Sequence, residues 1–200
     1  IIVESEGVYE RHSLPGSIDK ENLKEKLKKY SRLKVPIWIK VGMGRGIIDL
    51  IRYISDLKKE ENFPIEAITV DGFGGGTGMS PWLIMNETGI PSCAIFKEIN
   101  DTGKIGIDLI VSGGICEGTD IAKAIMLGAD GVAIGRAFLI AVQTNKENGV
   151  VNFTSAIKEE LQMICAILRK KKIDEIKGLR KNLFALSQDA KEIFGLENSL

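Results

Sequence analysis

Residues 107–136 read IDLIVSGGICEGTDIAKAIMLGADGVAIGR, and they contain one βα unit followed by the start of the next. The Ile- and Val-rich runs 107–111 and 131–134 predict strands, and their mostly apolar character indicates that both faces are largely buried. Between the two strands, 120–127 predicts a helix with an apolar face. A glycine-rich turn follows each strand. This order is typical of a parallel α/β sheet.

The same order of strand, turn and helix is predicted earlier in the chain. Residues 35–41 and 65–70 predict two more strands, and 47–59 predicts an amphipathic helix between them. We therefore expect an α/β fold of the TIM type, a (β/α)8 barrel. A complete barrel needs roughly 250 residues, whereas the chain offers four clear strands and one further candidate at 1–4. The sequence thus predicts the C-terminal half of a barrel. The exposed edges should pair with missing strands, in residues preceding Ile1 or in a second polypeptide.

The end of the chain departs from this rhythm. After residue 141 no further strand is predicted, and apolar residues recur at helical spacing: Phe153, Ile157, Leu161, Ile164 and Leu168. We expect residues 1–141 to form the barrel portion, incomplete at its N-terminus. Residues 142–200 should form a helical C-terminal extension packed on the barrel.

The composition excludes several classes of function. The 200 residues include 27 Lys+Arg and 27 Asp+Glu, so the net charge of +0 gives no basic surface for nucleic acid or an anionic membrane. No apolar run reaches the ~18 residues needed to span a bilayer. The three cysteines are odd in number and far apart, which indicates neither a disulfide framework nor a CxxC metal site. We expect a cytoplasmic protein that acts on a small-molecule substrate and binds neither nucleic acid nor membrane.

Two neighbouring glycine turns predict an anion-binding site. Ser112, Gly113 and Gly114 follow one strand, and Gly135 and Arg136 follow the next. Glycine lets backbone N–H groups approach an anion, the helix after each turn points its positive end the same way, and arginine adds a bidentate contact. The loops after the last two strands of a barrel form its usual phosphate site. Ordinary βα turns are the alternative, but the spacing of one βα repeat between the two turns favours a phosphate.

Lys40 and a glycine-rich segment are the other candidates. Lys40 ends an apolar strand, where an unpaired buried ammonium would be costly. We expect it at the mouth of the barrel, facing a ligand that carries or develops negative charge, although its side chain could instead reach solvent. Residues 71–81, DGFGGGTGMSP, suit a backbone that lies against a planar ring, with Thr77 and Ser80 offering hydroxyls. The alternative for this segment is a flexible loop.

Taken together, Lys40, the segment 71–81, SGGI at 112–115 and GR at 135–136 resemble the FMN-binding synthase domain of the glutamate synthase family. The resemblance covers most of the chain. It implies an FMN-dependent oxidoreductase that reduces 2-iminoglutarate, formed from 2-oxoglutarate and ammonia, or a similar imine to an amino acid.

The resemblance also implies a role for each candidate residue. Lys40 would lie near the pyrimidine end of the flavin ring and take part in catalysis, and Ser80 would face the ring or the substrate. The other cofactor-binding residues form two sets: Ser112, Gly113, Gly114, Gly135 and Arg136 would hold the phosphate, and Gly75, Gly76 and Thr77 would line the ring.

One departure from the family bears on the partners. Glutamate synthases commonly carry cysteines that bind an iron–sulfur cluster after the Gly-Arg strand, and residues 141–148 contain none. No metal ligands are therefore expected, and an electron-donor or glutaminase subunit is an expected partner.

Three alternative readings stay open. IMP dehydrogenase shares the glycine loops but needs a nucleophilic cysteine where residues 47–49 read Ile-Ile-Asp. Type 2 isopentenyl diphosphate isomerase shares the phosphate loops but not the segment 71–81. A non-catalytic barrel subunit is the third alternative.

Overall fold

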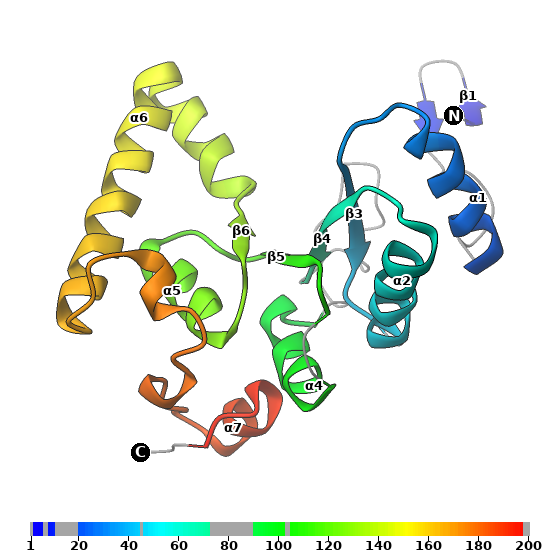
Figure 1. Cartoon of the computed structure of the whole chain (residues 1–200). Helices are drawn as coiled ribbons and strands as arrows, with labels where there is room; N and C mark the ends of the chain where they lie inside the picture. Colours follow the sequence, from blue (N-terminus) through cyan, green and yellow to red (C-terminus); the bar gives the residue numbers. More distant parts are fainter. Residues whose placement is uncertain are drawn as a thin grey trace.

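A computed structural model of the chain describes residues 2–5, 8–10, 20–44, 46–72, 90–102 and 105–197. Its main element is a sheet of four parallel strands in the order β3-β4-β5-β6 (Figure 1). The strands are β3 (Ile37–Gly42), β4 (Ile65–Asp71), β5 (Asp108–Ser112) and β6 (Gly131–Ala133). The four strands predicted from the apolar runs are confirmed, with ends shifted by at most two residues.

One face of the sheet holds the hydrophobic core. The fully buried residues Ile68, Val70 and Val111 lie on this face and belong to one apolar cluster with residues of the helices. These helices are α1 (Lys20–Ser31), α2 (Ile47–Glu61), α4 (Ile95–Thr102) and α5 (Gly118–Leu127). Each of α2 and α5 follows a strand and returns the chain to the start of the next, as a βα unit requires.

The opposite face of the sheet is much more open. Trp38 is 66% exposed, Lys40 is exposed, and Asp71 and Ser112 are half-buried. The register places these side chains on one face, because Gly42 pairs with Asp71 and Asp71 pairs with Ser112. In a closed barrel this face is the interior. Since β3 and β6 each have a neighbour on one side only among the described strands, the sheet is half of a (β/α)8 barrel.

Helix α6 (Arg136–Ile167) follows β6 and consists of two arms. Asn145 and Lys146 have non-helical dihedrals, and at this kink the chain turns back on itself, as the inverted V of Figure 1 shows. The arms meet closely at Gly149, where a Cβ atom would lie 1.9 Å from the carbonyl oxygen of Ala141. The expected boundary between residues 141 and 142 therefore falls inside the first arm, and the change of direction comes four residues later.

Among the described residues, neither end of the chain contributes a strand to the four-stranded sheet. The strand predicted at 1–4 does not join the barrel sheet: β1 (Ile2–Ser5) pairs antiparallel with β2 (Val8–Glu10) in a separate hairpin, because pairing across so short a connection costs little loop-closure entropy. The tail forms η2 (Ile173–Ile176), η3 (Arg180–Asn182) and α7 (Gln188–Phe194). In the part of the chain that the structure describes, none of the helices has the length and apolar character needed to cross a membrane.

Candidate functional site

The two glycine turns lie side by side at the carboxyl end of the sheet. Ser112, the last residue of β5, pairs with Ala133, the last residue of β6. Gly113 and Gly114 follow with φ angles of 112° and 74°, a region of the backbone map that favours glycine. The structure thus brings together the two turns that were predicted to form one anion site.

Open space faces both turns. A Cβ atom built on Gly114 or on Gly135 would meet no atom within 4 Å. A ligand can therefore approach the backbone of both turns directly. This is the arrangement that a phosphate bound by N–H groups requires.

The start of α6 carries positive charge at the same place. Gly135 is its N-cap and supplies no capping side chain, so the N–H groups of the first turn have no partner within the helix. The helix dipole adds to this positive end. Arg136 is exposed, and it forms no ion pair with any residue that the structure describes. Its guanidinium is available for a bidentate contact with an oxyanion.

The start of α5 is different, and sequence analysis did not foresee it. The backbone N–H of Gly118 donates to the Oε2 atom of Glu160, at 2.5 Å. Glu160 lies on the second arm of α6, which packs against α5. A carboxylate from the chain itself therefore occupies the positive end of α5. The prediction that the positive end of α5 is open to the anion is therefore wrong, whereas no side chain that the structure describes caps the start of α6.

Lys40 lies at the open face of the sheet and pairs with Asp71. Its Nζ atom is 2.5 Å from Asp71 Oδ2, and the two side chains are 63% and 34% exposed. Both reach the carboxyl end of the sheet, the end at which barrel enzymes hold their substrates. Lys40 thus lies on the same edge of the sheet as the glycine turns, with β4 between it and β5.

Asp71 links Lys40 to the glycine turns through the backbone. Its carbonyl oxygen accepts a hydrogen bond from Met43 N at 2.7 Å, and Gly72 N donates to Ser112 O at 2.8 Å. Asp71 was not among the predicted site residues. The signal was present, because an acidic residue that ends a strand beside the strand of Lys40 must lie near it in a parallel sheet.

Four predicted site residues lie outside the described residues: Gly75, Gly76, Thr77 and Ser80. Their roles in lining the ring and facing the substrate therefore stay predictions.

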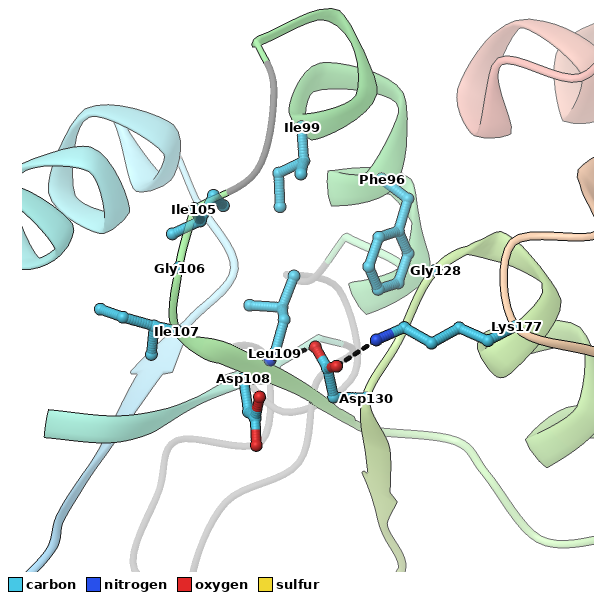
Figure 2. A pocket seen from close by; sticks show the side chains of 10 residues that line it. All are labelled: Phe96, Ile99, Ile105, Gly106, Ile107, Asp108, Leu109, Gly128, Asp130 and Lys177. Atoms are coloured by element: carbon cyan, nitrogen blue, oxygen red, sulfur yellow. Dashed lines mark hydrogen bonds and ion pairs between the residues drawn. The ribbon is translucent and has the colours of Figure 1, made fainter. Parts of the chain in front are cut away.

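A cavity of about 490 Å³ lies at the other end of β5, near the amino ends of the strands (Figure 2). Two of its charged lining residues, Asp130 and Lys177, already have partners in the protein. Asp130 accepts the N–H of Leu109 at 2.8 Å through one carboxylate oxygen and pairs with the ammonium of Lys177 through the other. Figure 2 shows these two contacts beside the apolar lining residues Phe96 and Ile99. The contacts fasten the tail to the base of the sheet.

Neither Cys93 nor Cys116 is an activated thiol. All three cysteines are free. Burial raises the pKa of the Cys93 thiol to about 11, and the hydrogen bond with the Asp120 carboxylate raises the pKa of the Cys116 thiol. Both thiols are therefore protonated near neutral pH. Within the described ranges, no three His, Cys, Asp or Glu side chains gather in a way that could hold a metal ion.

Solved structures with the same architecture define the class of protein. A flavocytochrome b2 variant with pyruvate bound matches over 82% of this chain and 38% of its own length, with 26% identity and a TM-score of 0.58. The flavin-binding domain of baker's yeast flavocytochrome b2 matches over 83% and 41%, with 24% identity and a TM-score of 0.57. The class that the fold defines is that of the α/β barrels, and the predicted barrel fold is confirmed.

The family follows from the sequence comparison. The model described as "Conserved region in glutamate synthase" matches residues 10–148, and the chain belongs to this family. A glutamate synthase large subunit-like protein of Rhizobium meliloti is 35% identical over 115 residues, which are 55% of this chain and 24% of that protein. The archaeal glutamate synthase [NADPH] of Methanocaldococcus jannaschii is 31% identical over 136 residues, or 66% and 26%. The chain thus spans about a quarter of the length of these relatives.

Proposed function

We propose that this chain is the phosphate-binding half of an FMN-dependent oxidoreductase barrel. The observation that carries the proposal is the pair of adjacent glycine turns that face open space beside the uncapped start of α6. Ser112, Gly113 and Gly114 would surround the phosphate from one side, and Gly135 and Arg136 from the other. A phosphate monoester matches this site, because one uncapped helix end and one arginine suit a single compact dianion.

The other predicted residues would serve the ring and the substrate. Lys40 would lie near the pyrimidine end of the ring, where its ammonium favours negative charge. Gly75, Gly76 and Thr77 would line the ring, and Ser80 would face the ring or the substrate. Bound FMN would supply hydride transfer to the carbon of an imine.

We propose 2-iminoglutarate, formed from 2-oxoglutarate and ammonia, as the acceptor, and glutamate biosynthesis as the role of the assembled enzyme. Two relatives named glutamate synthase and the family match support this substrate. Relatives named L-lactate dehydrogenase are also similar to this chain, at 30–32% identity over two thirds of its length. The substrate therefore needs a direct test, whereas the flavin site does not depend on it.

The open barrel requires a partner. Edge strands with free N–H and C=O groups on both sides of a four-stranded sheet need pairing, and Trp38 on the inner face is 66% exposed. Four more βα units, from preceding residues or from another chain, would close the barrel. An electron-donor or glutaminase subunit would complete the reaction. The three free thiols suit the reducing cytoplasm.

Titration of the purified protein with FMN and with riboflavin tests the phosphate site. We expect FMN to bind about 100-fold more tightly than riboflavin, since the phosphate makes charge-assisted hydrogen bonds worth roughly 3 kcal/mol in total. Equal affinity for the two flavins would contradict the proposal. With the barrel completed, oxidation of the reduced flavin by 2-oxoglutarate plus ammonia, compared with pyruvate, then tests the substrate.

A further inference from the structure

We propose that Asp71 is a positioning residue for Lys40, and that its carboxylate limits how strongly Lys40 favours the reduced, anionic flavin. The inference rests on the proposed function. It adds a residue that none of the predicted site roles includes.

The register of the strands sets the direction of the ion pair. Lys40 pairs with Thr69, whereas Asp71 pairs with Gly42, two residues nearer to the carboxyl end of the sheet. The Lys40 side chain must therefore extend toward the mouth of the barrel to bring Nζ within 2.5 Å of Asp71 Oδ2. The carboxylate thus selects, among the many rotamers of an exposed lysine, those that keep the ammonium at the mouth.

Asp71 is held more firmly than its partner. Hydrogen bonds to both neighbouring strands fix its backbone and that of Gly72. Gly72 is also packed tightly, since a Cβ atom there would lie 2.4 Å from Ser92 N and 2.8 Å from Ile90 O. Lys40 is a long side chain with 63% of its surface exposed, so its conformational freedom is large. Asp71 is therefore the rigid member of the pair, and its carboxylate determines where the flexible Lys40 side chain lies.

The pair contributes little to folding stability. Ion pairs between exposed groups stabilise a protein only slightly, because solvent screens them and ordering costs side-chain entropy. Its larger effect is on the charge at the mouth. While Asp71 is ionised, the ammonium is largely balanced, and a negative charge on the ring must share Lys40 with the carboxylate.

Substitution of Asp71 tests the charge balance. We expect Asp71→Asn to strengthen the binding of reduced FMN relative to oxidised FMN by about fivefold or more, because Lys40 then carries an unbalanced unit charge close to the ring. Lys40→Met should change the ratio of the two dissociation constants in the opposite direction. Asp71→Glu keeps the charge and should hold the ratio within about twofold of the wild-type value.

Asp108→Asn is the matched control. Asp108 is an exposed aspartate on the same sheet, at the amino end of β5, so its charge is far from the mouth. Its substitution should leave the ratio unchanged. An equal change in Asp108→Asn and Asp71→Asn, or no change in Asp71→Asn, would overturn the proposal.

A second measurement does not depend on flavin. Trace acylation of lysines with acetic anhydride, followed by peptide mass spectrometry, reports the accessibility of each amine. We expect Lys40 to react several-fold faster in Asp71→Asn than in the wild type or in Asp108→Asn, since the carboxylate shields it. An unchanged rate would show that Asp71 does not hold Lys40. A protein that fails to bind FMN would contradict the proposed function, and the acylation rates would still decide whether Asp71 positions Lys40.

Discussion

Helices α5 and α6 begin at the same edge of the sheet, each after a glycine-rich turn, yet their first turns differ in charge. At α5 the Glu160 carboxylate accepts the N–H of Gly118 at 2.5 Å. At α6 the N-cap is Gly135, which has no side chain to offer, and the first helical residue is the exposed Arg136. One helix end is therefore neutralised by the protein, and the other remains positive.

The difference teaches where an anion can bind. Glycine turns and helix N-termini are common to all βα units, so neither feature identifies a phosphate site alone. Of these two helices, the internal carboxylate removes α5 from consideration and leaves the start of α6 as the positive end. The same helix produces both effects, since α6 leaves its own start open and, through the kink at Asn145 and Lys146, returns Glu160 to the start of α5.

We expect the largest effect, a loss of folding stability, from a substitution that pushes the two arms of α6 apart. In Gly149→Ala the new methyl group would lie 1.9 Å from Ala141 O and 2.7 Å from Ala141 C. Backbone atoms cannot rotate away, so we expect a loss of about 3 kcal/mol in the free energy of unfolding, at the upper end for overpacked sites. Urea unfolding followed by circular dichroism measures it. Gly44→Ala is the matched control, because a Cβ atom at Gly44 meets nothing within 4 Å; equal destabilisation by both changes would contradict the close contact.

The second effect concerns the open helix end. Arg136→Ala should weaken FMN binding by about 30-fold, or roughly 2 kcal/mol, because a charge-assisted pair of hydrogen bonds to the phosphate is lost. Riboflavin binding should change little, since riboflavin has no phosphate. Lys123→Ala, which removes an exposed cation from α5, should leave both affinities unchanged. If Lys123→Ala weakened FMN binding as much as Arg136→Ala, the two helices would not differ in the way described.

The third effect concerns the closed helix end. Glu160→Gln keeps an oxygen acceptor but removes the charge, so we expect a loss of about 1 kcal/mol in the free energy of unfolding. FMN binding should stay the same or become up to about threefold tighter, because a negative charge near the phosphate is removed. Glu159→Gln, on an exposed neighbouring residue, should change neither quantity. Weaker FMN binding in Glu160→Gln would mean that the carboxylate supports the site instead of closing it.

The parts of this molecule that could be predicted from sequence are those set by local patterns. The strands were predicted from apolar runs of four to seven residues, and β5, α5 and β6 follow within 30 residues of one another. Helix α4 was not predicted, because its eight residues form too short an apolar pattern to stand out. The strand predicted at 1–4 is present as β1, but its place in the barrel sheet was predicted wrongly, since its partner is the nearby β2.

In the candidate site, too, the features set by local sequence could be predicted, and the long-range contact could not. The adjacency of Ser112–Gly114 and Gly135–Arg136 follows from one βα repeat, which the sequence displays. The contact between Gly118 and Glu160 joins residues 42 positions apart and depends on a kink at Asn145 and Lys146, where neither glycine nor proline marks a break. No local sequence pattern predicts such a contact, because it depends on the direction that the second arm of α6 takes after the kink.

The smallest effect uses Cys116 as a reporter at the start of α5. Its backbone N and its Sγ atom lie 3.1 Å and 3.5 Å from Asp120 Oδ2, and this contact raises the pKa of the thiol. A higher pKa means less thiolate at a given pH below it, and hence slower alkylation. Asp120→Asn removes the carboxylate, which lowers the pKa, so iodoacetamide at pH 7.5 should modify Cys116 faster than in the wild type.

The alkylation rate of Cys116 also distinguishes the effects of the two carboxylates at the start of α5, Asp120 and Glu160. Cys93 is an internal reference, since burial keeps its thiol protonated, and its alkylation should stay slow in every variant. Glu160→Gln should accelerate Cys116 much less than Asp120→Asn does, because Glu160 contacts Gly118 and not the thiol. Equal acceleration by the two substitutions would mean that Glu160 acts on the whole end of the helix through space. The neutral end of α5 would then result from a diffuse field, and the contrast with α6 would no longer rest on one hydrogen bond.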